Sequence, residues 1–169
     1  LNEGKILSLI SDAGTPLLSD PGRLLVNKCI SHGIQVIPIP GVSSITSAFS
    51  VSGFIDRFLF YGFLPKTENE LKKVLTVLSK NEYSQVFFVP SKKINFYINN
   101  FKTFYQGRKI LIAKEITKIH EVFIREEIEN LQEFKKPLKG ELTIIISENK
   151  LKAQQLDENK IVHKAKKYL

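Results

Sequence analysis

The pattern of apolar and polar positions predicts an alternation of strands and helices. Short, mostly apolar runs bounded by turn-forming residues are typical of strands, and they occupy residues 6–10, 34–39, 58–64, 85–89, 109–113, 121–125 and 142–146. Helices are expected over 23–31, 42–49, 68–80 and 94–104, and a helix or turn over 126–134. Strands that alternate with helices in this way indicate the α/β class.

The first two predicted strands each end in a loop of small residues. In open α/β sheets, ligands lie beyond the carboxyl ends of strands, where such loops stand. Ala13 and Gly14 let a ligand approach the backbone closely, and Asp12 can accept hydrogen bonds from a ribose or an amine. Ser43 and Ser44 open the next helix, whose first N–H groups are free. The two loops are expected to frame one pocket, although an ordinary strand-to-helix connection fits the first loop equally well.

Composition narrows the class of protein. The 169 residues are 43% hydrophobic and 25% charged, which is typical of a soluble globular chain with one ordinary domain or two small ones. The apolar runs are too short to span a bilayer and no signal sequence opens the chain, so we expect a cytoplasmic protein. Cys29 is the only cysteine and the three histidines are scattered, so we expect no disulfide and no metal site.

Charge is distributed unevenly along the chain. Residues 1–56 hold three basic and four acidic residues, a net charge of −1, and the whole chain has +8, which leaves +9 for residues 57–169. The second part could therefore face a polyanion. An ordinary lysine-rich solvated surface explains the same charge equally well.

The start of the chain suggests a fragment. Methionine is absent, even at position 1, and the first predicted strand follows almost at once. We therefore expect Leu1 not to be the natural start and an amino-terminal part to be missing. The domains are expected to be the remainder of an amino-terminal domain over 1–57, a second domain over 58–149, and a basic extension that begins at 150.

Neither a P-loop nor a G-x-G-x-x-G dinucleotide fingerprint is present. Five stretches in order nevertheless resemble the ribosomal RNA small subunit methyltransferase I family of the tetrapyrrole methylase superfamily. They are SDAGTPLLSDPG at 11–22, IPIPGVSS at 37–44, DRFLFYGFLP at 56–65, AKEITK at 113–118 and KGELTI at 139–144. The first run distinguishes this family from the corrin-modifying methylases, whose equivalent loop usually reads GDP.

The resemblance implies a two-domain α/β fold, with a parallel-rich sheet in the amino-terminal domain and a mixed sheet in the second. It implies S-adenosylmethionine as cofactor in the cleft between the domains, usually within a homodimer. The activity implied is methylation of a cytidine ribose 2′-hydroxyl in RNA of the small (30S) ribosomal subunit. The cofactor-binding residues implied are Asp12, Ala13 and Gly14, then Ser43 and Ser44 near the methionine end, and Val89, Leu142 and Thr143 near adenine through backbone contacts.

Methyl transfer to a ribose hydroxyl needs in-line positioning and gains from a base, because the hydroxyl is a poor nucleophile. Glu115 and Lys118 are the catalytic candidates, and a surface ion pair at the end of a strand is the simpler interpretation of the same residues. The family's first strand and first loop have no counterpart here, so we expect the chain to be inactive on its own.

Two other functions stay open. A corrin or porphyrin methylase predicts a GDP-type loop and no basic second part, and a non-catalytic RNA-binding fragment predicts RNA binding without cofactor binding. The chain also departs from the family after the strand over 85–89. Pro90, Ser91, Lys92 and Lys93 stand where the family often has Glu followed by Ser/Thr-His-Arg, although positive charge is kept.

Overall fold

The computed structural model describes residues 3–149, and its centre is one mixed five-stranded sheet. The strands follow the order β1-β2-β5-β3-β4, with bounds β1 Phe58–Phe63, β2 Ser84–Pro90, β3 Lys109–Lys114, β4 Val122–Glu127 and β5 Glu141–Ile146. β1 and β2 are parallel, whereas β5 runs antiparallel to β2 and β3, and β4 antiparallel to β3. The ends of β1, β2 and β3 and the starts of β5 and β4 therefore lie along one edge, which we call the carboxyl edge.

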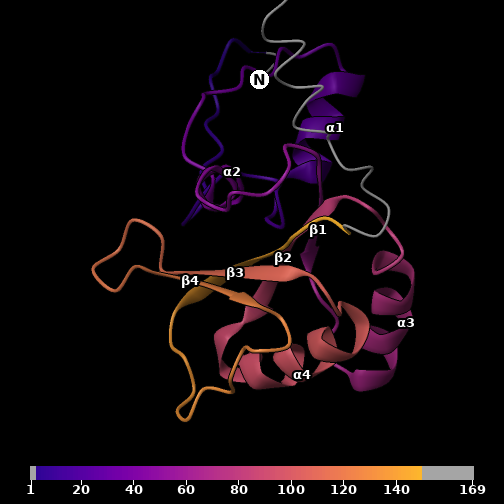
Figure 1. The fold of residues 1–169 in the computed structure, drawn as a ribbon. Helices are drawn as coiled ribbons and strands as arrows, with labels where there is room; N and C mark the ends of the chain where they lie inside the picture. The colour runs from indigo at the N-terminus through magenta and orange to yellow at the C-terminus, as the bar shows by residue number, and fades with distance from the viewer. Residues whose placement is uncertain (1–2, 150–169) are drawn as a thin grey trace, which may run out of the picture.

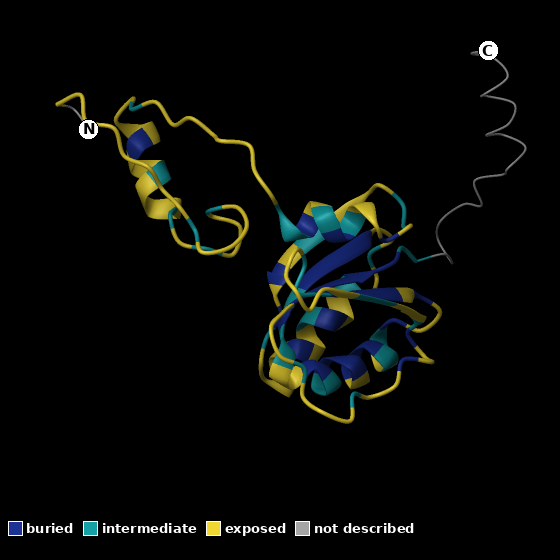
Figure 2. Ribbon diagram, turned by 90° about the vertical axis from the view of Figure 1, so that its left-hand side faces the viewer, coloured by how far each residue is buried: buried dark blue, intermediate teal, exposed yellow. Residues whose placement is uncertain are grey.

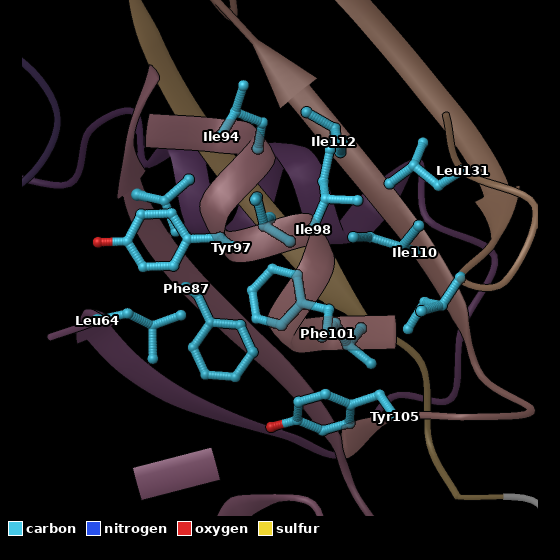
Figure 3. Close-up of a cluster of buried hydrophobic side chains, with 14 of the residues drawn as sticks. Leu64, Phe87, Ile94, Tyr97, Ile98, Phe101, Tyr105, Ile110, Ile112 and Leu131 are labelled. Carbon is cyan, nitrogen blue, oxygen red and sulfur yellow. The ribbon is translucent and has the colours of Figure 1, made fainter. Parts of the chain in front are cut away.

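Two helices cover one face of the sheet (Figure 1). They are α3, Glu68–Leu78, and α4, Ile94–Phe104, each with an apolar stripe at helical spacing. Phe87 of β2 stacks on Phe101 of α4 with ring centroids 5.9 Å apart. Figure 3 shows these rings among the isoleucines of α4 and β3, in the main hydrophobic core.

The other face of the sheet is covered by the short helix α2, Ser44–Ser50, so the sheet lies between α2 and the α3–α4 pair (Figure 1). Ile45 and Ala48 are the buried residues of α2, and they pack in a second core with Val86, Leu111 and Ile145 of the sheet. Successive side chains along β3 and β5 alternate between the two cores, as the two-residue period of a strand requires.

The segments ahead of α2 are mostly exposed (Figure 2). Helix α1, Arg23–Ser31, forms as predicted, but residues 6–10 and 34–39 are not strands. Their large apolar side chains face solvent; Ile6 is 96% exposed and Ile39 is 86% exposed. An extended segment becomes a strand only when a neighbour pairs with its backbone groups, and among residues 3–149 none pairs with these two.

All five strands predicted over 58–146 form, and the chain is α/β with a mixed sheet, as expected. Residues 126–134 contain the end of β4 and a turn, which was one of the two expected alternatives. The predicted basic extension lies outside the described residues. Within residues 3–149 no helix is long and apolar enough to cross a membrane.

Candidate functional site

The carboxyl edge brings three of the predicted cofactor-binding residues together. Val89 of β2 lies opposite Leu142 of β5 in the ladder, and Thr143 lies opposite Ala113 of β3. Val89, Leu142 and Thr143 are all buried, with 3–5% of each residue exposed. Val89 and Leu142 lie side by side because the end of β2 pairs with the start of β5 in the middle of the sheet, and Thr143 is the next residue of β5.

The two small-residue loops also meet. The Thr15 hydroxyl donates a hydrogen bond of 3.3 Å to the carbonyl of Val42, directly before Ser43 and Ser44. Within the first loop, the Ser11 hydroxyl donates to the carbonyl of Gly14 at 3.1 Å. The bond from the Thr15 side chain to the Val42 carbonyl places the two loops side by side, as a pocket between them would need.

Gly14 lies at an open point of the first loop. Its φ of +72° is a left-handed conformation that a side chain makes costly, and a Cβ placed there meets no heavy atom within 4 Å. Asp12, Ala13 and Gly14 are all exposed. The backbone is thus accessible to a ligand at this point, which fits the chemistry expected of a cofactor loop.

The same loop reaches the carboxyl edge further along. Gly62 of β1 has a φ of +88°, and a Cβ placed there would lie 2.9 Å from the Ser19 hydroxyl oxygen. β1 carries a register irregularity at this position. The close approach of Ser19 to Gly62 connects the first loop to the end of β1.

Glu115 and Lys118 are in contact, at the turn that follows β3. The Glu115 carboxylate accepts hydrogen bonds from the backbone N–H of Glu141 at 2.8 Å and from the Lys118 ammonium at 3.1 Å. Lys118 also donates to the Glu141 carboxylate at 3.0 Å. Glu115 and Thr117 both have positive φ, so a strained turn holds this group of three charges at the carboxyl edge.

These contacts shift the pKa values of both Glu115 and Lys118. The backbone N–H of Glu141, and then the Lys118 ammonium, lower the pKa of the Glu115 carboxyl below its ordinary value. Hydrogen bonds to Glu141 and then Glu115 raise the pKa of Lys118. The ion pair is therefore fully charged at neutral pH, and a carboxylate with a lowered pKa is a weaker proton acceptor than a free glutamate.

Two surface cavities lie away from the predicted cofactor-binding residues. One, of about 420 Å³, lies at the start of α4 and includes Lys66, Lys93 and Lys135 in its lining. The other lies beside α1 and includes Cys29 and His32. Neither is lined by a predicted cofactor-binding residue. In the described part of the chain, no group of three or more His, Cys, Asp or Glu side chains is arranged to hold a metal.

The sequence pattern did not predict the first of these cavities. Its lysines are separated along the chain, and the departure from the family at Lys92 and Lys93 was the one signal in the sequence that pointed to it. The hydrophobic pattern also did not indicate that Arg108 would be buried, with 3% of the residue exposed.

The chain belongs to the tetrapyrrole (corrin/porphyrin) methylases, because the family's sequence profile matches residues 1–132. Among its curated relatives is a ribosomal RNA small subunit methyltransferase I of Thermotoga maritima, 40% identical over 151 residues that cover 87% of this chain and 67% of the relative. A relative of the same name in Rickettsia prowazekii is 39% identical over 88% of this chain and 54% of the relative. The family resemblance of the five sequence stretches is thereby confirmed, and the chain spans about half to two thirds of the length of these relatives.

Solved structures confirm the fold. The methyltransferase CobJ is similar with a TM-score of 0.59 at 16% identity, over 80% of this chain and 62% of that one. Diphthine synthase is similar with a TM-score of 0.56 at 16% identity, over 79% of this chain and 57% of that one. At identities this low, the similarity shows a shared fold and says nothing about a shared substrate.

Proposed function

We propose that this chain is part of an enzyme that transfers a methyl group from S-adenosylmethionine to a cytidine ribose 2′-hydroxyl in small-subunit ribosomal RNA. The observation that carries the proposal is the match to relatives named ribosomal RNA small subunit methyltransferase I over 87% of this chain. The five motif stretches lie inside the part of the chain that forms the two loops and the carboxyl edge.

The cofactor is held by the two loops and the middle of the carboxyl edge. Asp12, Ala13 and Gly14 form one wall, and Ser43 and Ser44 lie against the methionine end, next to the Thr15–Val42 hydrogen bond. The adenine end would lie near the backbone of Val89, Leu142 and Thr143, since the side chains of Val89 and Leu142 pack in the main core. S-adenosylmethionine, when bound, supplies a methyl group that its sulfonium has already activated.

The catalytic pair is Glu115 with Lys118. Glu115 stays ionised at neutral pH, so it can accept the proton of the ribose hydroxyl, while its lowered pKa makes it a weak base. Lys118 fixes the carboxylate through the 3.1 Å ion pair. Most of the rate enhancement then comes from positioning, as expected when the methyl donor is already activated.

The basic second part supports RNA over a corrin or porphyrin substrate, because the formal charge of +9 that residues 57–169 carry suits a polyanion. The first loop carries SDAGTP rather than a GDP-type sequence, which also opposes the corrin alternative. A non-catalytic RNA-binding piece is the other candidate, favoured by the exposed segments 6–10 and 34–39, which leave the first sheet unformed.

The proposal extends to the domains, the oligomeric state and the location of the enzyme. Segments 6–10 and 34–39 have the composition of strands, and we assign them to a parallel sheet of a first domain that ends near residue 57, followed by a second domain over 58–149. The working enzyme is a cytoplasmic homodimer that acts on the 30S subunit, and the lysine-rich segment from residue 150 contacts RNA.

A methyl-transfer assay tests the proposal. A joined protein is made by fusing to this chain the segments of the Thermotoga maritima relative that the match leaves uncovered. With S-adenosylmethionine labelled in its methyl group and small-subunit ribosomal RNA, label is expected in a 2′-O-methylcytidine. Glu115→Gln is expected to lower the rate about 100-fold, at the low end for loss of a general base because its pKa is already depressed.

Glu141→Gln is the matched control. It removes a carboxylate that also contacts Lys118, yet it keeps the backbone N–H that holds Glu115, so its rate is expected to stay within about threefold. Equal losses in the two variants would show that the turn matters and Glu115 is not the base. Label in a corrin precursor and none in RNA would refute the RNA assignment.

A further inference from the structure

The cavity at the start of α4 is lined by four lysines and by no acidic residue. Lys66 comes from the segment after β1, Lys92 and Lys93 from the turn after β2, and Lys135 from the segment after β4. The rest of the lining is apolar or amide, including Asn95 and Phe96. Its volume of about 420 Å³ lies within the range of small-ligand sites.

Hydrogen bonds from α4 fix the two outer walls of this cavity. The Asn95 side chain donates to the Phe134 carbonyl at 3.0 Å and accepts from the Phe134 N–H at 2.9 Å, which holds the segment that carries Lys135. The Tyr97 hydroxyl donates to the Pro65 carbonyl at 3.2 Å, directly before Lys66. The backbone directly before Lys66 and Lys135 is therefore held in place by side chains of α4.

Within the cavity, one lysine is placed by its own contacts. The Lys93 ammonium donates to the Lys66 carbonyl at 3.2 Å and lies 5.9 Å from the centre of the Phe96 ring. Cation–π and hydrogen-bond contacts of this kind hold a lysine without neutralising it. The positive charge remains available to a ligand.

No carboxylate within the described residues forms an ion pair with any of the four lysines; the five salt bridges lie elsewhere. The neighbouring acid, Glu133, accepts a hydrogen bond from Asn99 at 2.8 Å instead. The first turn of α4 contains no acidic residue and its N-cap makes no side-chain hydrogen bond, so the positive end of that helix adds to the same field. Four like charges repel each other, and an anion between them relieves that repulsion.

The turn that carries Lys92 and Lys93 follows the end of β2, at the same edge of the sheet as the candidate catalytic group. Lys92 comes two residues after Pro90, the last residue of β2, and Pro90 pairs with Glu141 of β5. Glu141 in turn contacts Lys118. The lysine-bearing turn is therefore connected through the end of β2 to the strand that carries Glu141.

We propose that this lysine cavity binds a backbone phosphate of the RNA substrate and so positions the strand at the carboxyl edge. The inference rests on the proposed function and deepens it, because it names the surface that holds the RNA. A phosphodiester suits a cavity that is lined by four lysines, none of which forms an ion pair with a described carboxylate, and phosphate contacts carry position rather than sequence.

Two double variants test the cavity in the 169-residue chain: Lys92→Gln with Lys93→Gln, and Lys66→Gln with Lys135→Gln. The matched control is Lys73→Gln with Lys102→Gln, which removes the same charge from exposed or half-buried positions outside the cavity lining. The probe is a labelled single-stranded RNA of twelve nucleotides, titrated at several salt concentrations. Each cavity variant is expected to bind about tenfold more weakly, and the slope of log affinity against log salt is expected to become shallower by about 0.7 for each phosphate that the variant no longer neutralises.

The control pair is expected to weaken binding less than about threefold. Equal losses in all three variants would overturn the proposal, since they would show a response to net charge alone. Inorganic phosphate serves as the second probe. It is expected to raise the melting temperature of the unaltered chain and not of the cavity variants. If phosphate raises the melting temperature of the unaltered chain but the cavity variants bind RNA as tightly as that chain, the proposal is also overturned. The cavity would then be a site for a free anion.

The methyl-transfer assay separates this proposal from the proposed function. If the joined protein methylates RNA while the cavity variants bind RNA normally, the cavity assignment is wrong and the proposed function stands. If the cavity variants lose RNA binding while the joined protein transfers no methyl group, the cavity assignment stands and the proposed function is wrong.

Discussion

Replacing Arg108 with methionine is expected to lower the free energy of unfolding by about 3 kcal/mol. The Arg108 guanidinium donates hydrogen bonds to the carbonyls of Ser79 and Asn81, each at 2.7 Å, and of Ser147 at 3.2 Å. It also lies 5.1 Å from the centre of the Tyr105 ring. Methionine keeps most of the apolar packing but leaves three carbonyls without their charged donor, at the point where α3, α4 and β5 meet.

Urea denaturation measures this loss, and Lys109→Met is the matched control. Lys109 is the next residue, its side chain is half exposed, and its ion pair with Glu127 is 3.5 Å long. The control is expected to change stability by less than about 0.5 kcal/mol. A loss below about 1 kcal/mol for Arg108→Met would mean that water replaces the guanidinium and that the buried cation is not a structural anchor.

Replacing Phe101 with alanine is expected to lower the free energy of unfolding by about 4 kcal/mol. Phe101 is fully buried, and its ring centre lies 5.9 Å from that of Phe87, 6.0 Å from that of Tyr105 and 6.4 Å from that of Tyr97 (Figure 3). Removing the ring leaves a cavity between α4 and the sheet that neighbouring rings cannot fill without moving.

Phe101→Leu separates the loss of volume from the loss of the aromatic group. Leucine fills most of the space, so a loss under about 2 kcal/mol is expected in the same urea titration. Similar losses for leucine and alanine would contradict the cavity explanation and point to the ring contacts instead.

The second part of the chain could be predicted closely from sequence because its strands pair with one another. All five strands from β1 to β5 have partners within the described residues, so their local patterns and their final environment agree. Residues 6–10 and 34–39 have equally apolar patterns, yet pattern alone does not supply a hydrogen-bonding neighbour. A sequence pattern predicts that a segment can be a strand, and pairing decides whether it is one.

The candidate site was predictable to a similar extent. Glu115 and Lys118 were named from their place after the strand over 109–113, with a surface ion pair as the simpler interpretation, and the structure shows that ion pair. Their partner Glu141 was not predicted, because it comes from the start of a strand 23 residues beyond Lys118. The lysine cavity was not predicted for the same reason. Its residues come from three separate segments of the chain that the tertiary structure brings together.

We propose that the loops around Gly14 and Ser43, with the carboxyl edge, bind S-adenosylmethionine. Calorimetric titration of S-adenosylmethionine into the joined protein tests it most directly, and the 169-residue chain alone shows how much of the site it supplies. Gly14→Ala and Gly107→Ala form a matched pair, since each glycine has a φ of +72° and open space at its Cβ position. We expect one binding site per joined chain, weakened about tenfold by Gly14→Ala and unchanged by Gly107→Ala. Absence of binding to the joined protein, or equal affinity in the two variants, would contradict this assignment.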